Sequence, residues 1–455
     1  MAGRHQVAVY IALVTITACT AGLLFFVDPL SDHQCALLVV VALAAWVALV
    51  RLGNREGLPV RPVVVAIAVM IGAGVVAPTQ QSDDIFAYAM YGRIVVEHHD
   101  NPWNEPPARY PGDPMERHVA RLWVDTADIY GPGFTALMVA AAPLVGTSTL
   151  LARLVYQTVA ALAVALLFWL LWRRTRNPVV LAFVGLFPLT AASVVNGGHP
   201  DALLALALLG GVLLARDDRP VAAGFAFAAA VSINATMFAA AVVLAAWAWR
   251  RWKLADTARF LGIVAIVGAL PYLFLGGWFD TARDHARLIS RQATWNVVAS
   301  VFTAGSPLSV ADLSRDQMAS VAANGATAIA AGLLVLVVLR HTRTNVAYSV
   351  AAAVAIFVVT TPWVMPWYGF IALPLFALSR LNLLAWAVAL YAGCLFIGDQ
   401  YPRLAASNIG TVLQQTLQIW GPAVAFIVVA ATIAFGKTPP EGELPTGERA
   451  LAASA

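Results

Sequence analysis

Long apolar runs recur along almost the whole chain, and they constrain its fold more than any other feature. A helix that crosses a membrane needs about 20 mostly apolar residues. Runs of about this kind occupy residues 7–27, 35–50, 62–78, 148–172, 178–195, 201–215, 258–275, 318–339, 346–361, 366–379, 383–398 and 416–435. The run 220–249 is too long for one simple span, and we predict two shorter helices broken near Ser232–Asn234.

The composition agrees with a membrane protein. Hydrophobic residues make up 60% of the 455 residues and charged residues only 11%, whereas a soluble globular protein averages about 45–50% apolar and about 25% charged residues. We therefore predict an all-α polytopic membrane protein, a bundle of about 12–14 membrane helices. The net charge of +4 comes from short arginine clusters between apolar runs, which is typical of membrane orientation and not of nucleic-acid binding.

The basic clusters predict the orientation. Cytoplasmic loops are enriched in Lys and Arg. The basic clusters between the apolar runs all fall on one side of the predicted bundle: Arg51, Arg55, Arg61, Arg173, Arg174, Arg176, Arg216, Arg219, Arg250, Arg251, Lys253, Arg340, Arg343 and Arg380. This holds if both termini are cytoplasmic and if 132–146 does not cross. Its prolines and glycines fit a re-entrant or amphipathic segment in the outer leaflet.

The opposite, extracytoplasmic side then receives the longest polar stretch, 79–131, together with shorter segments at 196–201, 276–317, 365–368 and 399–415. We predict one transmembrane domain over 1–436, with 79–146 as an outer loop that carries the active site. The tail 437–455 is rich in Pro, Gly, Glu and Ala and is predicted to be a disordered cytoplasmic tail. The expected location is the inner (plasma) membrane, in contact with the lipid bilayer.

The outer loop begins with two carboxylates, Asp83 and Asp84, directly after a membrane run. Ionisable groups at this depth are functional candidates, although both residues also suit the start of a helix as caps. A helix from Asp84 places Tyr88 and Tyr91 on its face, and the nearby Arg93 could pair with a carboxylate or a phosphate.

Further candidates lie in the other outer segments. His199 and Asp201 stand at the mouth of the 201–215 helix, where Asp201 either caps the helix or joins a polar site beside Asp84. Trp367 and Tyr368 follow Trp363 in a corner rich in proline, which suits an aromatic membrane belt or a surface that stacks on a sugar.

A third group of candidates is basic. Arg283, Arg287 and Arg291 recur every four residues on a predicted extracytoplasmic helix, where they form either a solvated face or a site for a lipid phosphate. The adjacent His98 and His99 would point in different directions on a helix, so we predict no metal site there.

Several segments of the chain resemble those of a known group of enzymes. The segments SDDIFAYAMYGR (82–93), DNPW (100–103), YPGDP (110–114), WVDTADIYGP (123–132), GHPDALLAL (198–206) and MPWYGFIALPL (365–375) are similar to the GT-C superfamily of polyprenyl-phosphate-sugar-dependent glycosyltransferases. Within it they resemble the actinobacterial α-1,6-mannosyltransferases of lipomannan and lipoarabinomannan assembly, over most of residues 60–380. The chain departs from that pattern at Asn234, where relatives often carry Lys, and in HPD, where HND is common.

This resemblance implies a GT-C-like fold and an inverting mannosyltransferase of cell wall biosynthesis. The donor would be a polyprenyl-phosphate mannose at the outer face, and the acceptor a mannan-type glycolipid. The family's catalytic Asp corresponds to Asp84, before Ile85 and Phe86, with Asp83 as the alternative. The resemblance specifies no cofactor, and a divalent cation at the leaving phosphate stays an option.

The residues themselves agree with such a reaction. Attack by a weakly acidic sugar hydroxyl calls for a general base, and the polar candidates gather on one side of the predicted membrane protein. A transporter or flippase of lipid-linked sugars is the alternative, but such proteins usually have repeated halves that meet at mid-membrane. A related enzyme that uses another sugar, such as arabinose, is the second alternative.

Overall fold

The computed structural model describes residues 2–26, 30–80, 82–302, 313–379, 381–400, 417 and 420–439. These residues are mainly helical, and five helices are long and apolar enough to cross a membrane: Arg4–Phe25, Asp32–Glu56, Thr149–Thr175, Leu254–Phe274 and Arg315–Arg340. Large apolar side chains such as Val14, Leu162 and Val335 are more than half exposed on them, as expected for surfaces that face lipid. The prediction of an all-α polytopic membrane protein is confirmed.

The helices follow the predicted apolar runs. The longer ones are α1 (Ala2–Phe25), α2 (Asp32–Glu56), α3 (Val60–Val76), α7 (Thr149–Thr175), α9 (Asp201–Arg216), α15 (Arg315–Arg340), α16 (Val346–Thr360), α18 (Leu383–Gln400) and α20 (Gly421–Phe435). Other runs are interrupted: 178–195 forms α8 (Pro178–Gly185) and the π-helix η3 (Thr190–Val195), and 366–379 forms η7 (Pro366–Ile371) and α17 (Leu373–Ala377). Pro188 and Pro374 lie in these interrupted runs and cannot donate a backbone hydrogen bond.

The predicted break in 220–249 is confirmed at Asn234. α10 (Pro220–Ile233) ends there, and the chain continues through η4 (Ala235–Met237) into α11 (Phe238–Arg251). The Asn234 side chain caps the second half by accepting from the Thr236 N–H. Carbonyls at the end of α10 find partners elsewhere, since Ile233 O accepts from the Gly131 N–H and Val231 O from the Tyr272 hydroxyl. The end of α10 is therefore hydrogen-bonded to the outer loop through Gly131.

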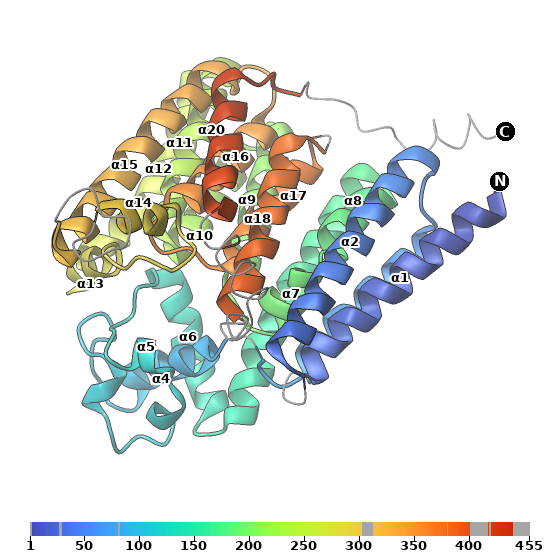
Figure 1. Cartoon of the computed structure of the whole chain (residues 1–455). Coiled ribbons are helices and arrows are strands. Elements are labelled where there is room, and N and C mark those ends of the chain that lie inside the picture. Colours follow the sequence, from blue (N-terminus) through green and yellow to red (C-terminus); the bar gives the residue numbers. More distant parts are fainter. Residues whose placement is uncertain are drawn as a thin grey trace.

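The outer loop is a compact unit at one end of the bundle (Figure 1). Its elements are α4 (Asp84–Val96), η1 (Pro107–Arg109), η2 (Glu116–His118), α5 (Arg121–Val124) and α6 (Pro132–Val145). α4 packs closely on α6, since a Cβ at Gly92 would lie 2.3 Å from Met138 O.

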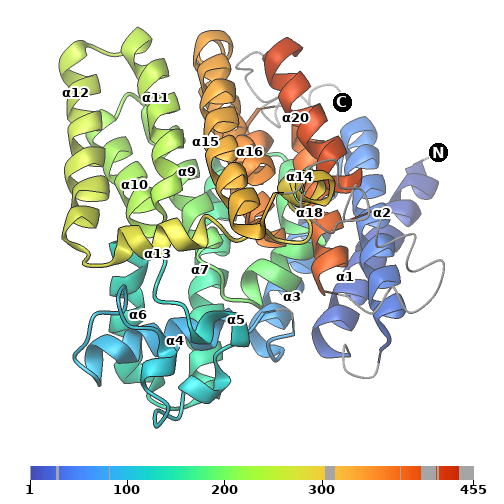
Figure 2. The same cartoon turned by 60° about the vertical axis from the view of Figure 1, so that its left-hand side comes forward.

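The loop before α15 contains two shorter helices at the same end. α12 (Leu254–Ile263) continues through η5 (Val264–Ala269) and η6 (Leu270–Phe274), and is followed by α13 (Trp278–His285) and α14 (Thr294–Phe302). Figure 2 shows α13 lying across the boundary between α9–α12 and the outer loop. We call this end of the molecule, with α4–α6 and α13, the site end.

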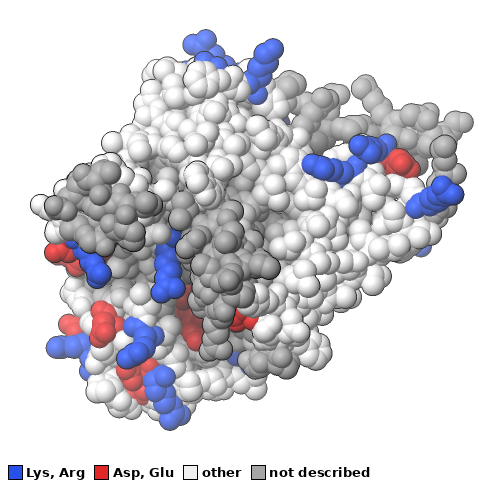
Figure 3. All heavy atoms as spheres, viewed as in Figure 1, with Lys and Arg blue, Asp and Glu red and all other residues white. Residues whose placement is uncertain are grey.

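The two ends of the bundle differ in charge. In Figure 3 the upper part carries blue Lys and Arg spheres and very few red ones, whereas both colours occur together at the lower left, around the site end. The start of α1 and the end of α20 both lie at the upper end, where His5 pairs with Glu56 and His341 binds Ile433 O. The first and last described helices therefore have their outer ends on the same side of the bundle (Figure 1). Most of the predicted outer segment 399–415 lies outside the described residues, because the description stops at Gln400. The predicted tail 437–455 also lies outside them from residue 440 onward.

Candidate active site

Asp84 is the first residue of α4 and lies almost completely buried, with 8% of its surface exposed. Its Oδ1 accepts a 2.7 Å hydrogen bond from the indole N–H of Trp123, and its Oδ2 lies 3.8 Å from His199 Nδ1. The Ser82 hydroxyl accepts from the Asp84 N–H. A carboxylate held in a defined direction in this way suits a general base.

Asp83 was predicted to cap α4, and this prediction is wrong. The residue occupies the N-cap position, but its side chain makes no capping hydrogen bond. Its backbone, with φ −94° and ψ 13°, is not in the extended conformation from which a cap side chain reaches back to the helix N–H groups.

The predicted tyrosine face of α4 is confirmed. Tyr88 and Tyr91 line a small void of about 10 Å³ together with Asp84 and Trp123, a space close to that of a single water molecule. The Tyr88 hydroxyl lies 3.2 Å from the Tyr130 hydroxyl and 3.3 Å from His199 Nδ1. The void therefore adjoins a hydrogen-bonded group of Tyr88, Tyr130 and His199 that lies beside Asp84.

His199 is held between this group and the aromatic corner. Its ring stacks on Trp367 with centroids 3.7 Å apart, and the preceding Gly198 has φ +58°, a conformation that glycine adopts readily. Burial lowers the pKa of His199 to about 3, so the imidazole is neutral at pH 7. Trp367 thus supports His199 and does not line the large cavity described below.

The segment from Asp128 to Gly131 fixes the position of Tyr130. The buried carboxylate of Asp128 accepts from the Tyr130 N–H at 2.9 Å and from the Thr135 hydroxyl at 2.7 Å. Burial raises the pKa of Asp128 to about 7, although both hydrogen bonds oppose this change. The indoles of Trp103 and Trp278 bind the backbone oxygens of Tyr130 and Ile129. Sequence analysis named this segment only for its resemblance to the family and missed these contacts.

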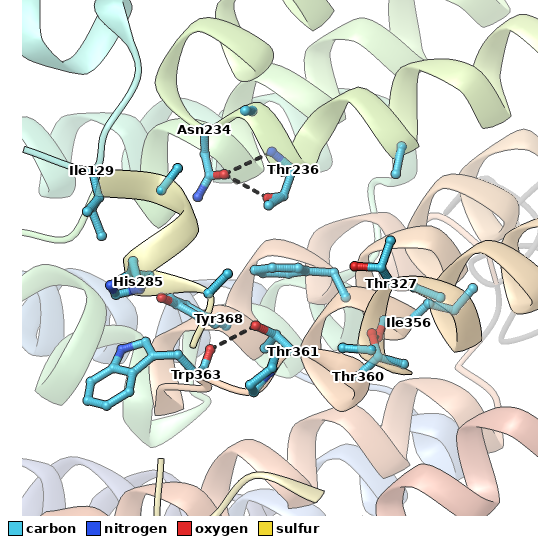
Figure 4. Close-up of a pocket in the computed structure, with 18 of the residues that line it drawn as sticks. Ile129, Asn234, Thr236, His285, Thr327, Ile356, Thr360, Thr361, Trp363 and Tyr368 are labelled. Atoms are coloured by element: carbon cyan, nitrogen blue, oxygen red, sulfur yellow. Dashed lines mark hydrogen bonds between the residues drawn. The ribbon is translucent and has the colours of Figure 1, made fainter. Parts of the chain in front are cut away.

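Tyr130 connects the small void with a large cavity of about 500 Å³, because it lines both. Such a volume is typical of ligand sites. One end is polar, with Asp201, Asn234, His285 and Tyr368, and Figure 4 shows His285 and Tyr368 beside each other there. The other end is apolar and lies between α15 and α16, with Ala323, Ala326, Ala330, Ala331, Ala353 and Ile356 among its walls.

Asp201 and Asp84 approach the same tyrosine from different sides. Burial raises the pKa of Tyr130 well above its ordinary value, and the negative charges of Asp84 and Asp201 act in the same direction. Asp201 is the first residue of α9, where a carboxylate suits the helix dipole. It lines the large cavity, whereas Asp84 lines the adjoining void. The structure thus brings the predicted pair of carboxylates together around Tyr130.

Of the two partners predicted for Arg93, a carboxylate or a phosphate, the structure shows the carboxylate. Arg93 lies outside the cavity and the void, and its guanidinium binds Asp113 at 2.9–3.1 Å and Gly146 O at 3.0 Å. Burial raises the pKa of Asp113, but hydrogen bonds from Arg93, the Met115 N–H and His98 bring it below its ordinary value. Arg93 therefore holds the outer loop together by a buried ion pair.

The predicted arginine stripe is wrong as a helical feature. α13 ends at His285, so Arg283, Arg287 and Arg291 do not share one helix face. All three are exposed, Arg283 pairs with Asp280, and none of them lines the cavity. The spacing of four residues indicated a stripe only on the assumption that the helix continued.

The residues that sequence reasoning missed are Trp123, Asp128, Tyr130 and His285, and they contact the site from the outer loop and α13. Within the described part of the chain, no three His, Cys, Asp or Glu side chains gather as metal ligands. The site as described is thus a set of buried carboxylates, neutral histidines and aromatic rings beside an apolar groove.

A family model for the N-terminal domain of α-(1→6)-mannopyranosyltransferases matches residues 11–251, more than half of the chain. The chain belongs to this family. The match includes α4, the Asp128 segment and the start of α9, and therefore both candidate carboxylates.

A curated relative agrees with this family. α-(1→6)-Mannopyranosyltransferase A of Corynebacterium glutamicum is 25% identical over 324 residues, which is 64% of this chain and 66% of the relative. The match thus spans slightly less than two thirds of the relative's length. No solved structure matches the chain significantly.

Proposed function

We propose that this protein is a membrane mannosyltransferase that moves mannose from a polyprenyl-phosphate donor to a cell-envelope glycan or glycolipid at the outer face of the plasma membrane. The single observation that carries the proposal is the cavity, which joins an apolar groove between α15 and α16 to a polar end beside two carboxylates. Family membership supports the sugar and an α-1,6 linkage.

The two ends of the cavity suit the two parts of a lipid-linked sugar. The alanine-rich walls on α15 leave room for an isoprenoid chain, and the donor sugar would then lie near Asp201, Asn234 and Tyr368. Hydroxyl and amide groups are available there for sugar hydroxyls. Since these groups gather at one end of the bundle and not at its middle, they favour an enzyme over a transporter.

In the proposed reaction, a hydroxyl of the acceptor attacks C1 of the donor mannose while the bond from C1 to the phosphate oxygen breaks. The hydroxyl proton passes to Asp84, and polyprenyl phosphate leaves with the electron pair. Attack from the side opposite the phosphate converts a β-linked donor into an α-linked product. Asp201 is proposed to bind sugar hydroxyls.

The choice of donor tests this proposal. Protein in nanodiscs is mixed with an α-mannoside acceptor and with polyprenyl-phosphate mannose, polyprenyl-phosphate arabinose or a nucleotide-linked mannose. We expect product from the first donor alone. Transfer from the nucleotide-linked sugar would contradict the assignment of the apolar groove to the lipid of the donor. A preference for polyprenyl-phosphate arabinose would contradict the assignment of mannose as the transferred sugar.

Trp123 offers a specific prediction about positioning. Trp123→Phe keeps an aromatic ring but removes the N–H that binds Asp84 Oδ1 at 2.7 Å. We expect kcat to fall by about tenfold to a hundredfold, in line with the loss of roughly 1.5–3 kcal/mol for a hydrogen bond to a charged group. The KM for the donor should stay within about threefold by the same reasoning. Steady-state kinetics check this, and a change confined to the donor KM would contradict it.

Topology is a second prediction. We expect the site end to be extracytoplasmic and both termini cytoplasmic, because the opposite end carries the basic clusters. Single cysteines at Ser82 and Arg174 are treated with an impermeant thiol reagent in intact cells. Labelling at position 82 and protection at 174 are expected, and the reverse pattern would invert the orientation.

A further inference from the structure

Three aromatic rings from distant parts of the chain meet at the polar end of the cavity. Trp123 comes from α5, His285 from the end of α13 and Trp363 from the segment between α16 and η7. The rings of Trp123 and His285 are stacked with their planes inclined by 27° and their centroids 5.8 Å apart, and Trp363 lies edge-on to both at 6.1 and 5.8 Å. We call these three residues the aromatic cluster.

One side of the aromatic cluster faces the large cavity, and the other side is buried. His285 and Trp363 line the large cavity, whereas Trp123 lies behind His285 and binds Asp84. The candidate base and the exposed rings are thus connected through one indole. A sugar that rests on His285 and Trp363 would therefore be connected to Asp84 through the Trp123 ring.

His285 carries a polar atom that still lacks a partner. Its Nδ1 is buried and makes no hydrogen bond with any described residue, which leaves a buried polar atom unsatisfied. Burial lowers the pKa of His285 to about 4, so the ring is neutral at pH 7. A neutral imidazole can accept from or donate to a hydroxyl.

The aromatic rings at this end suit a sugar. Aromatic rings provide large apolar contact surfaces with little loss of conformational freedom, which suits the carbon–hydrogen face of a sugar. In Figure 4 His285 and Trp363 lie at the end of the cavity away from Thr327 and Ile356, which mark the apolar groove.

We propose that the aromatic cluster is the subsite for the sugar ring of the acceptor that receives the mannose. His285 and Trp363 contact that ring, and Trp123 positions both His285 and Asp84. The proposal rests on the proposed function, in which Asp84 takes a proton from the acceptor and the lipid of the donor occupies the apolar groove. A donor sugar would instead be expected nearer to Asp201.

Kinetics with separate variation of donor and acceptor test this subsite. Wild type, His285→Ala and Trp363→Ala are compared with polyprenyl-phosphate mannose and an alkyl α-mannoside. We expect the KM for the acceptor to rise by about tenfold in each variant, as for the loss of one aromatic or hydrogen-bonded contact. The KM for the donor should change by less than about threefold. A rise in the donor KM alone would overturn the proposal.

Matched variants separate binding from folding. Phe279 is on the same helix as His285, is 51% exposed and does not line the cavity, so Phe279→Ala should leave both KM values unchanged. His285→Gln and Trp363→Tyr keep a hydrogen-bonding group and an aromatic ring, and we expect them to recover most of the acceptor affinity at wild-type thermal stability. Failure of both conservative variants to recover any affinity would contradict the proposed contacts.

Direct binding distinguishes this proposal from the proposed function. Calorimetry measures the binding of the alkyl α-mannoside to each protein without a donor. Weaker binding to Trp363→Ala than to wild type supports the subsite even if wild type transfers no mannose, a result that would refute the proposed function alone. Equal binding to both proteins, or no binding to wild type, refutes the subsite.

Discussion

Replacing Asp84 by Asn is expected to lower turnover by about a hundredfold to ten-thousandfold, the range typical for loss of a general base. Asn keeps the size of the side chain and can still accept from the Trp123 indole, but it cannot take the proton of the acceptor hydroxyl. Donor binding should change much less, because the carboxylate acts on the acceptor. Turnover and donor binding are measured on the same preparation in nanodiscs.

The neighbouring carboxylate is the matched control for this prediction. Asp83 makes no capping hydrogen bond and is exposed, so Asp83→Asn should retain turnover. If Asp83→Asn loses turnover while Asp84→Asn keeps it, the two roles are reversed. If both variants stay active, the base lies elsewhere, and Asp201 on the cavity wall is the next residue to replace.

The largest effect on stability is expected at Asp113. Asp113→Ala would leave the buried guanidinium of Arg93 without its carboxylate, which typically costs about 3–5 kcal/mol. The folded-state pKa of Asp113 is lowered, so the ion pair stabilises the protein at neutral pH and loses this effect as pH falls below the ordinary value of about 3.9. Thermal unfolding in detergent should show a clear fall in Tm.

An exposed ion pair provides the comparison. Glu105 and Arg109 pair at 3.0 Å with side chains 28% and 68% exposed, so Glu105→Ala should cost less than about 1 kcal/mol. Equal stability of wild type and Asp113→Ala would show that Arg93 finds another partner, and the account of the outer loop would then be wrong.

The sequence predicted those features that depend on local periodicity. Long apolar runs predicted the helices because a membrane leaves few alternatives. The face formed by Asp84, Tyr88 and Tyr91 followed from a spacing of three to four residues, and α4 is continuous over all of them. The break at Asn234 was predictable because the run was too long for a single span.

Features that depend on tertiary contacts could not be predicted in this way. Trp123, His285 and Trp363 lie far apart in the chain and meet only because α13 lies across the outer loop. Arg93 was expected to pair with a carboxylate or a phosphate, but the sequence could not identify Asp113 as the partner, because Asp113 follows only after an irregular stretch. The arginine stripe failed because nothing local marked the end of α13 at His285.

The identity and linkage of the product test the central claim most directly. Purified protein in nanodiscs is incubated with radiolabelled polyprenyl-phosphate mannose and an α-mannoside acceptor, and the product is examined by linkage analysis. The account predicts a labelled acceptor with one added α-linked mannose, at the 6-position, formed by wild type and almost absent with Asp84→Asn. Failure to transfer any mannose, together with movement of the intact donor across a sealed vesicle membrane, would contradict it and indicate a transporter.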